Sequence, residues 1–191
     1  MLLTNDNRKN RIFVTGLIGS GKSTTGFLLA EKLNYKYIDL DVLIENRVKI
    51  PLVDIFLKYG ENYFRNIESE ILQEVVNLEK FVISTGAGTL LNPENVYLIK
   101  NSGILIYLRC EPSDIWRRIK ETPKVVLLHY PDEPKDMMLN DEDAYLRIES
   151  ILKIRETGYL MADIVVDTKD KNSETVVKEM LWEVEKLFIG I

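Results

Sequence analysis

Eight residues near the N-terminus constrain this chain more than any other part of its sequence. Residues 16–23 read Gly-Leu-Ile-Gly-Ser-Gly-Lys-Ser, a glycine-rich loop of the pattern G-x-x-x-x-G-K-[ST]. The apolar run Ile12-Phe13-Val14 precedes the loop, and a segment with helical periodicity follows it. A loop of this kind between a strand and a helix turns its backbone amides toward a polyphosphate. The pattern therefore predicts a nucleoside triphosphate site in an α/β fold.

The residues of this loop have separate roles. Glycine lets the backbone approach a ligand closely, because it has no Cβ. Lys22 can reach the outer phosphates and the Ser23 hydroxyl can bind Mg²⁺, while the helix that opens at Lys22 adds free amides and its positive end. The predicted nucleotide-binding residues are Gly16, Gly19, Ser20, Gly21, Lys22, Ser23 and Thr24.

Composition narrows the class of protein further. A chain of 191 residues, 46% of them apolar, is expected to form one catalytic domain over residues 1–191. The net charge of −5 gives no overall field that would attract nucleic acid or an anionic membrane. No apolar run is long enough to span a bilayer, and the single cysteine, Cys110, is predicted to be structural. We expect a cytoplasmic monomer with a small-molecule substrate and no nucleic-acid or membrane partner.

Short apolar runs alternate with segments of helical periodicity along the chain. The runs predict strands at 12–15, 36–38, 81–84, 104–108 and 163–166. Helices are predicted at 23–33, 62–77, 93–100, 112–120, 143–157 and 173–188, with Trp116 and Trp182 on their buried stripes. This alternation favours a three-layer α/β/α domain with a five-stranded parallel sheet. Ligands of such sheets bind beyond the carboxyl ends of the strands, where the glycine-rich loop, residues 39–41 and residues 84–88 all fall.

The stretch 121–142 interrupts this rhythm with three prolines and many acidic residues. Long irregular connections in compact domains are usually functional, and a phosphoryl-transfer site needs a cover that excludes water. We therefore predict a lid at about 121–142, with a loop of no function as the alternative. Its acidic residues lack the compact spacing of a metal site, and we interpret them as a solvated face.

Asp39 and Asp41 follow the second predicted strand. Alternation along a strand would place both side chains on the same side. One carboxylate could then serve Mg²⁺, while the other orients a substrate hydroxyl and accepts its proton. The alternative is that one of the pair only caps the helix that begins there.

Two further pairs have helical spacing. Arg65 and Glu68 are three residues apart and can meet on one helix face. Arg155 and Tyr159 are four residues apart on the carboxyl side of the predicted lid, where an arginine could return to the crevice. Most pairs of this kind are ordinary surface pairs, so neither identifies a site alone.

In order and spacing, these motifs resemble the shikimate kinase family, whose members are small P-loop kinases of the nucleoside monophosphate kinase type. The resemblance covers nearly the whole chain. It rests on the loop at 16–24, Asp39-x-Asp41, Phe64-Arg65-x-x-Glu68, Ser84-Thr85-Gly86-Ala87-Gly88 and Arg155-x-x-x-Tyr159. Together these motifs are far more specific than the glycine-rich loop by itself.

The resemblance implies an activity and its catalytic residues. The activity is transfer of the γ-phosphoryl group of Mg·ATP to the 3-hydroxyl of shikimate, a reaction of aromatic amino acid biosynthesis. Lys22 would contact the transferred group, and Ser23 with Asp39 would hold Mg²⁺ directly or through water. Asp41 would orient the shikimate hydroxyls and act as the base.

The resemblance also implies a binding site for the rest of each substrate. Arg65 and Arg155 would clamp the shikimate carboxylate, for which the planar fork of guanidinium is suited, and Glu68 would orient Arg65. The other implied contacts are Phe56 and Phe64 around the ring, the backbone of Gly86, Ala87 and Gly88 against shikimate, and Arg118 against adenine.

The chain departs from the family pattern at three places. Ala87 replaces a glycine, so its Cβ is expected to intrude beside shikimate, and a positive φ there would be strained. The family's lid motif Arg-Pro-Leu-Leu reads Val125-Val126-Leu127-Leu128, which removes an arginine, and Lys124 is the predicted substitute. The lid is also longer than is usual in the family.

Three functions are compatible with this sequence. The first is a shikimate kinase. The second is an ATP-dependent kinase of another small hydroxy acid, because the changed loop and lid would reshape the pocket. The third is a non-catalytic protein that binds nucleotide and has lost turnover with the lid arginine. Adenylate and gluconate kinases are disfavoured, since neither is expected to combine Asp39-x-Asp41 with Phe64-Arg65-x-x-Glu68.

Overall fold

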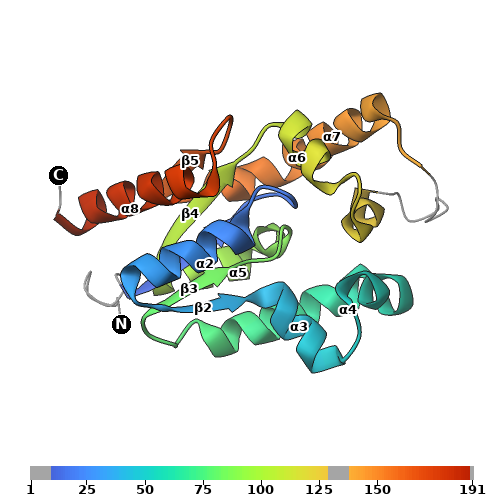
Figure 1. The fold of residues 1–191 in the computed structure, drawn as a ribbon. Coiled ribbons are helices and arrows are strands. Elements are labelled where there is room, and N and C mark those ends of the chain that lie inside the picture. Colours follow the sequence, from blue (N-terminus) through green and yellow to red (C-terminus); the bar gives the residue numbers. More distant parts are fainter. Residues whose placement is uncertain (1–9, 129–137, 190–191) are drawn as a thin grey trace.

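The structure is a computed structural model and describes residues 10–128 and 138–189. A five-stranded parallel sheet lies at its centre, as predicted, in the order β2-β3-β1-β4-β5 (Figure 1). The strands are β1 Arg11–Thr15, β2 Lys36–Asp39, β3 Phe81–Ser84, β4 Ile104–Arg109 and β5 Ile164–Asp167. Because β1 is central, the glycine-rich loop leaves the sheet between the carboxyl ends of β3 and β4.

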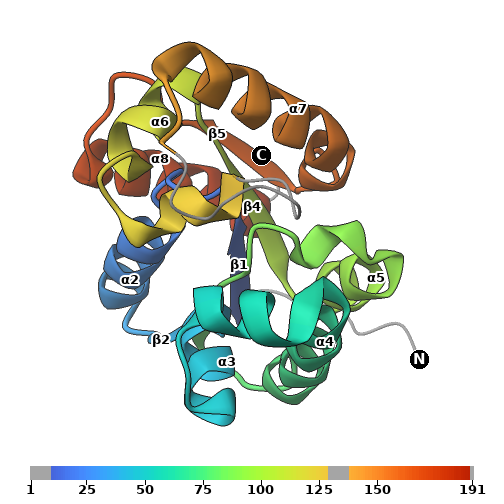
Figure 2. The ribbon, with the colours of Figure 1, turned by 90° about the vertical axis from the view of Figure 1, so that its right-hand side faces the viewer.

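Helices cover both faces of the sheet, as the three-layer prediction requires. Their bounds are α2 Lys22–Leu33, α3 Leu40–Val48, α4 Leu52–Val75, α5 Pro93–Ser102, α6 Pro112–Ile119, α7 Asp141–Tyr159 and α8 Ser173–Ile189. Two short 3₁₀ helices, η1 Thr89–Leu91 and η2 Pro123–Leu128, join them. Figure 2 shows α6 and α7 at one end of the molecule and α3 and α4 at the other, with β1 between them.

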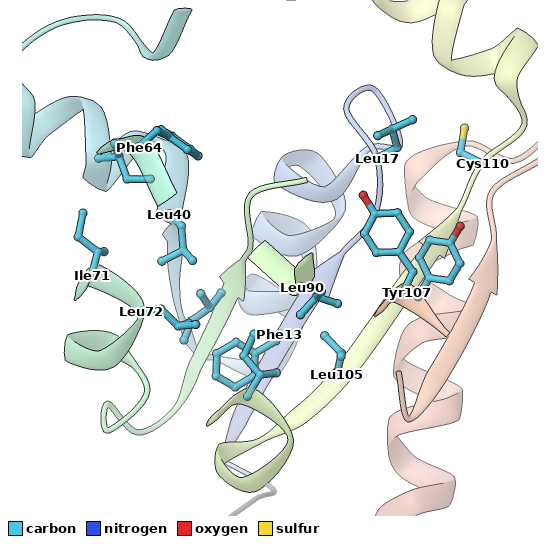
Figure 3. Close-up of a cluster of buried hydrophobic side chains, with 14 of the residues drawn as sticks. Phe13, Leu17, Leu40, Phe64, Ile71, Leu72, Leu90, Leu105, Tyr107 and Cys110 are labelled. Carbon is cyan, nitrogen blue, oxygen red and sulfur yellow. The ribbon is translucent and has the colours of Figure 1, made fainter. Parts of the chain in front are cut away.

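The side chains of β1 alternate between two apolar cores. Ile12 and Val14 pack with α2 and α8 on one face of the sheet. Phe13 points to the other face, where it joins Leu72 of α4 and Leu105 of β4 in the larger cluster (Figure 3). This period of two is what a strand buried on both faces requires. The position of the loop after β1 is therefore fixed from both sides.

Two helical segments differ from the prediction. Helix α3 follows β2 directly, and α4 begins ten residues before the predicted start at 62. Gly60 explains why the first part of α4 was not recognised, because its φ of 79° and ψ of 171° kink the helix and interrupt the 3.6-residue pattern. The lid was predicted at 121–142, and the structure places η2 at its start and the first residues of α7 at its end. Residues 129–137 lie outside the described residues.

The prediction for the two tryptophans was right for one of them. Trp116 is buried, but Trp182 is 60% exposed. Helix α8 buries the stripe formed by Val176, Val177, Met180 and Val184, and Trp182 lies two residues from Met180 on the opposite side. No helix within residues 10–128 and 138–189 is long and apolar enough to cross a membrane.

A buried arginine joins the start of β1 to two helix ends. The Arg11 side chain donates from Nε to Leu78 O at 2.6 Å, just after α4, and from Nη1 to Ser102 O at 3.0 Å, the last residue of α5. Arg11 is only 7% exposed. If its side chain were removed, bulk water could not easily replace the charged donor to the Ser102 carbonyl.

We expect Arg11→Met to lower the free energy of unfolding by roughly 1–3 kcal/mol, because the buried Ser102 carbonyl would be left without its donor. Urea denaturation followed by circular dichroism would measure this loss. Arg47→Met is the matched control, since Arg47 pairs at the surface with Glu74 and the two side chains are 40% and 59% exposed. An equal loss in both variants would contradict the role given to Arg11.

Candidate active site

The glycine-rich loop has the backbone that phosphate binding requires. Gly16, Gly19 and Gly21 all adopt positive φ, at 146°, 77° and 99°. A Cβ on Gly16 would lie 2.7 Å from Leu108 O, and one on Gly19 would lie 2.9 Å from Ile119 Cγ2, so both positions are also sterically closed. A Cβ on Gly21 would meet no described atom within 4 Å, which leaves the mouth of the loop open.

The N-terminus of α2 closes the loop. Gly21 is its N-cap and supplies no side-chain acceptor, so the first turn offers its amides to a bound anion. The Lys22 ammonium donates to Leu17 O at 3.1 Å across the loop. Ser20 is buried, its N–H donates to Leu17 O at 3.1 Å, and its hydroxyl has no hydrogen-bond partner in the described part of the chain. Ser20 thus shapes the loop from within, while Ser23 and Thr24 are exposed at its mouth.

Asp39 caps a helix, which was one of the two alternatives, and its second oxygen lies beside the glycine-rich loop. Its Oδ1 accepts the Asp41 N–H at 3.1 Å, which caps α3. Its Oδ2 accepts the Ser23 hydroxyl at 2.7 Å. The carboxylate therefore caps one helix and at the same time faces the first turn of α2.

Asp41 faces a different part of the crevice. The expected strand alternation does not apply to it, because β2 ends at Asp39 and Asp41 lies in the first turn of α3. A Cβ built on Gly86 would lie 3.1 Å from Asp41 Oδ1 and would collide with Glu68 Oε1. Asp41 is therefore next to the Gly86 loop, whereas Asp39 is next to the glycine-rich loop.

Arg65 is the centre of an ionic cluster on α4. It donates from Nη1 to Glu68 Oε2 at 2.7 Å, and from Nε and Nη2 to Glu61 Oε1 at 3.2 and 3.1 Å. Its guanidinium carbon lies 4.9 Å from the centre of the Phe64 ring. Burial lowers the pKa of the Arg65 guanidinium. The negative charges and hydrogen bonds of Glu68 and Glu61 raise it by more, so the pKa lies above its ordinary value.

Glu68 is fully buried and holds Arg65 firmly. Its other oxygen, Oε1, accepts the Thr89 hydroxyl at 2.7 Å, so both carboxylate oxygens have partners. A buried ion pair is tolerated only when the remaining lone pairs are satisfied in this way. The predicted Arg65–Glu68 pair is confirmed, and Glu61, which the sequence analysis did not select, is a third member.

The Gly86–Gly88 segment lies against this cluster. A Cβ on Gly88 would collide with the Arg65 guanidinium, so that glycine is required for close approach. The expected strain at Ala87 is wrong, because none of residues 86–88, all of which the structure describes, has a positive φ. Ala87 packs against the larger apolar cluster, and the Tyr159 hydroxyl donates to Ala87 O at 2.5 Å. Its methyl group is therefore accommodated by the core.

Tyr159 brings Arg155 to the same place. Its ring stacks on Tyr107 of β4 with centres 4.9 Å apart, which fixes the end of α7 over the sheet. Burial raises the pKa of the Tyr159 phenol, and the positive charges of Arg155 and Arg65 act in the opposite direction. Arg155 lies one turn before Tyr159 on α7, so it is near the 86–88 segment that Arg65 also contacts. That the two arginines together bind a carboxylate stays a prediction.

Arg118 of α6 lies beside the glycine-rich loop. Its Nη1 donates to Gly19 O at 2.9 Å and approaches Cys110 Sγ at 3.6 Å. Cys110 is buried, in agreement with its predicted structural role, and burial raises the pKa of its thiol. Arg118 is exposed, and its contact with adenine stays a prediction.

The start of the predicted lid is only partly described. Val125 is half-buried in η2 and packs against the larger apolar cluster, and its N–H donates to Thr122 O at 3.1 Å. The side chain of Lys124, the predicted catalytic substitute, lies outside the described residues, so its role stays a prediction.

Tyr37, to which the sequence analysis gave no role, completes the site. The Tyr37 hydroxyl lies 3.1 Å from Asp39 Oδ2 and 3.0 Å from Ser84 Oγ. Burial, together with the negative charge of Asp39, raises the pKa of Tyr37, so the hydroxyl keeps its proton. The signal was available, because Tyr37 is two residues before Asp39 on β2 and strand alternation puts both on one side.

A phosphate loop after the central strand and a separate arginine and carboxylate cluster at the same edge of the sheet define a P-loop kinase for a small acceptor. The family model "Shikimate kinase" matches residues 18–185. A shikimate kinase of Caldanaerobacter subterraneus subsp. tengcongensis is 36% identical over 176 residues, which are 92% of this chain and 96% of that protein. The chain belongs to the shikimate kinase family.

Solved structures agree with this assignment. The shikimate kinase of Bacteroides thetaiotaomicron superposes with a TM-score of 0.80 at 29% identity, over 92% of this chain and 98% of the other. The Acinetobacter baumannii shikimate kinase, solved in complex with shikimate, has a TM-score of 0.77 at 26% identity and covers 98% of both chains. The predicted fold and family are therefore confirmed.

Proposed function

We propose that this protein transfers the γ-phosphoryl group of ATP to the 3-hydroxyl of shikimate. The observation that carries the proposal is the gathering of three side chains at residues 86–88: Asp41 lies beside Gly86, the Tyr159 hydroxyl donates to Ala87 O, and the Arg65 guanidinium lies against Gly88. Arg155 lies one turn before Tyr159 on α7. Two guanidinium groups from distant helices favour a carboxylate ligand, and Asp41 supplies an acceptor for the proton of a hydroxyl. The chemistry of this site therefore suits a hydroxy acid.

The nucleotide would occupy the other half of the crevice. The amides that follow Gly21 and the Lys22 ammonium would hold the phosphates, and Arg118 would lie against the base. Lys22 would leave Leu17 O for the transferred group as its negative charge develops. These residues bind and position the donor, which is the main task of the protein in phosphoryl transfer.

The donor set beside the loop fits Mg²⁺. The Ser23 hydroxyl and Asp39 Oδ2 are 2.7 Å apart, and both are the oxygen ligands that this ion prefers. One carboxylate is enough, because Mg²⁺ in kinases takes its other ligands from phosphates and water. Ser23 and Asp39 would therefore hold the ion, which supplies positive charge to the phosphate oxygens when it is bound.

The acceptor would be held by its carboxylate and activated at its hydroxyl. Arg65 and Arg155 fix one end of the molecule, and the backbone of residues 86–88 supports it. Asp41 then orients the attacking hydroxyl and takes its proton as the phosphoryl group is transferred. Phe56 and Phe64, whose ring centres are 4.3 Å apart, form the apolar wall.

A panel of acceptors tests this substrate assignment against the alternatives. ADP release would be followed with ATP and Mg²⁺ and, in turn, shikimate and other cyclic and linear hydroxy acids. We expect the highest kcat/KM with shikimate. A higher value with another acid would assign a different acceptor, and binding without any ADP formation would identify a non-catalytic protein.

Glu61 is expected to oppose acceptor binding, because it occupies the Nε and Nη2 edge of Arg65 that a substrate carboxylate needs. We expect Glu61→Gln to lower the KM of the acceptor roughly two- to fivefold with little change in kcat, because an exposed pair of this kind contributes at most about 1 kcal/mol. Steady-state kinetics would measure the change. Glu70→Gln, on the exposed side of the same helix, is the control. An unchanged or higher KM would show that Glu61 assists binding.

We also propose that the protein is a monomer that acts in the cytoplasm. Light scattering at micromolar concentration would test the monomeric state, and a larger mass would contradict it.

A further inference from the structure

The Tyr37 hydroxyl links the two halves of the phosphate site. It lies 3.1 Å from Asp39 Oδ2, the oxygen that also accepts the Ser23 hydroxyl at 2.7 Å. On its other side it lies 3.0 Å from Ser84 Oγ, which in turn lies 3.1 Å from Lys22 O. A continuous chain of contacts thus runs from the carboxylate on β2, through β3, back to the first residue of α2.

The number of protons in this chain sets the direction of its hydrogen bonds. Tyr37 and Ser84 have one hydroxyl proton each, but they make three contacts, to Asp39, to each other and to Lys22 O. An ionised carboxylate only accepts, and hydrogen bonds to charged groups are the stronger ones. Tyr37 therefore donates to Asp39, and Ser84 is left to donate to Tyr37 or to the carbonyl.

Residues of α2 pack closely against the ring of Tyr37. A Cβ on Gly26 of α2 would lie 2.8 Å from Ser84 Oγ and 3.0 Å from Tyr37 Cε2, so the helix can approach only because residue 26 is glycine. The Phe27 ring meets the Tyr37 ring edge to face, with centres 5.9 Å apart. The ring of Tyr37 is therefore held independently of its hydroxyl.

We propose that Tyr37 is a positioning residue for the metal site, in which its hydroxyl holds Asp39 Oδ2 in place for Mg²⁺. The inference rests on the proposed binding of Mg²⁺ by Ser23 and Asp39. Asp39 Oδ1 is fixed by the Asp41 N–H, so Tyr37 fixes the second oxygen and prevents rotation of the carboxylate. Partners that hold a metal ligand in this way typically change metal affinity about 10- to 100-fold when they are removed.

The test compares ADP binding with and without Mg²⁺. In wild type, calorimetric titration with ADP should show tighter binding when Mg²⁺ is present. In Tyr37→Phe the affinity measured in EDTA should stay within about twofold, because the ring and the loop are retained. The factor by which Mg²⁺ tightens ADP binding should fall about tenfold. The Mg²⁺ concentration for half-maximal turnover should rise by a similar factor, with kcat at saturating Mg²⁺ nearly unchanged.

Two further variants separate positioning from a structural effect. Tyr97→Phe removes a hydroxyl from a tyrosine that is 74% exposed, and it should match wild type in every titration. Ser84→Ala leaves Asp39 as the partner of the Tyr37 hydroxyl, so its Mg²⁺ response should be kept. If Tyr37→Phe does not fold, loss of the Mg²⁺ response in a folded Ser84→Ala would overturn the inference, and its retention would support it.

These titrations separate a wrong inference about Tyr37 from a wrong metal site. If wild type responds to Mg²⁺ and Tyr37→Phe responds equally, only the inference about Tyr37 is wrong. Equal weakening of ADP binding in EDTA and in Mg²⁺ would show that Tyr37 acts on the loop rather than on the metal site. If wild-type affinity for ADP does not depend on Mg²⁺, the proposed metal site is wrong as well.

Discussion

Replacing Lys22 with methionine is expected to lower kcat by about 10²- to 10³-fold, the effect typical of removing one preorganised donor from a transition state. In the structure the Lys22 ammonium is at the open mouth of the loop and donates to Leu17 O at 3.1 Å. This contact keeps the charge beside the site without burying it. Methionine retains much of the apolar length of the side chain, so the loop should keep its shape while the charge is lost.

The Lys22→Met result needs a control for charge and for folding. Lys32→Met removes an exposed lysine from the other end of the same helix and should leave kcat unchanged. Thermal unfolding of both variants should differ little from wild type. A kcat for Lys22→Met within fivefold of wild type would contradict the placement of the phosphates at this loop.

The second large effect is expected at Asp41. Asp41→Asn should lower kcat by roughly 10²- to 10⁴-fold, the range for removal of a general base, while ADP affinity stays near that of wild type. The expected loss of kcat follows from the position of Asp41 beside Gly86, at the acceptor end of the crevice. ADP affinity should be kept because the carboxylate that contacts Ser23 belongs to Asp39. Asparagine keeps the size of the side chain but cannot accept a proton.

A matched variant distinguishes catalysis from a helix effect. Asp54 also lies in the first turn of its helix, α4, and is exposed, so Asp54→Asn shares any loss of favourable interaction with a helix dipole. It should leave kcat unchanged. If Asp41→Asn loses ADP affinity in proportion to kcat, then Asp41 belongs to the nucleotide site and the assignment of the two carboxylates must be exchanged.

Local sequence patterns predicted those parts of the site that are close together in the chain. The glycine-rich loop and the Arg65–Glu68 pair are each contained within one turn or one helix, so their spacing alone determines their geometry. The strands were predicted for a similar reason, because sheets buried on both faces need continuous apolar runs. Their order in the sheet does not follow from such patterns.

The role of Tyr37 depends on a contact between distant segments, because β3 brings Ser84 beside it. Glu61 is different, since it lies four residues before Arg65 on α4 and its helical spacing was available in the sequence. Ala87 was expected to be strained because the family glycine suggested a positive φ, but the backbone there is ordinary and Tyr159 holds its carbonyl. Trp182 was predicted to be buried, but it lies on the side of α8 opposite to the buried stripe.

The predicted lid has an apolar residue at the position where the family motif has an arginine. Val125 replaces the arginine of the family motif and packs against the apolar cluster, so it brings no charge to the phosphates. We predict that turnover with shikimate is slow for this reason, with Lys124 as the nearest cation in sequence. Arginines in this role accelerate other phosphoryl-transfer enzymes by about 10³- to 10⁵-fold.

We expect the site to phosphorylate a hydroxyl of an acid that Arg65 and Arg155 hold, and we expect this acid to be shikimate. The most direct measurement compares ADP release with shikimate and with its methyl ester, which keeps the ring and all hydroxyls but has no carboxylate. We predict shikimate-dependent ADP formation with a phosphorylated product identified by mass, and a kcat/KM at least about tenfold lower for the ester, as loss of a charged hydrogen bond requires. No ADP release above background with shikimate, or equal kcat/KM for the two compounds, would contradict this expectation.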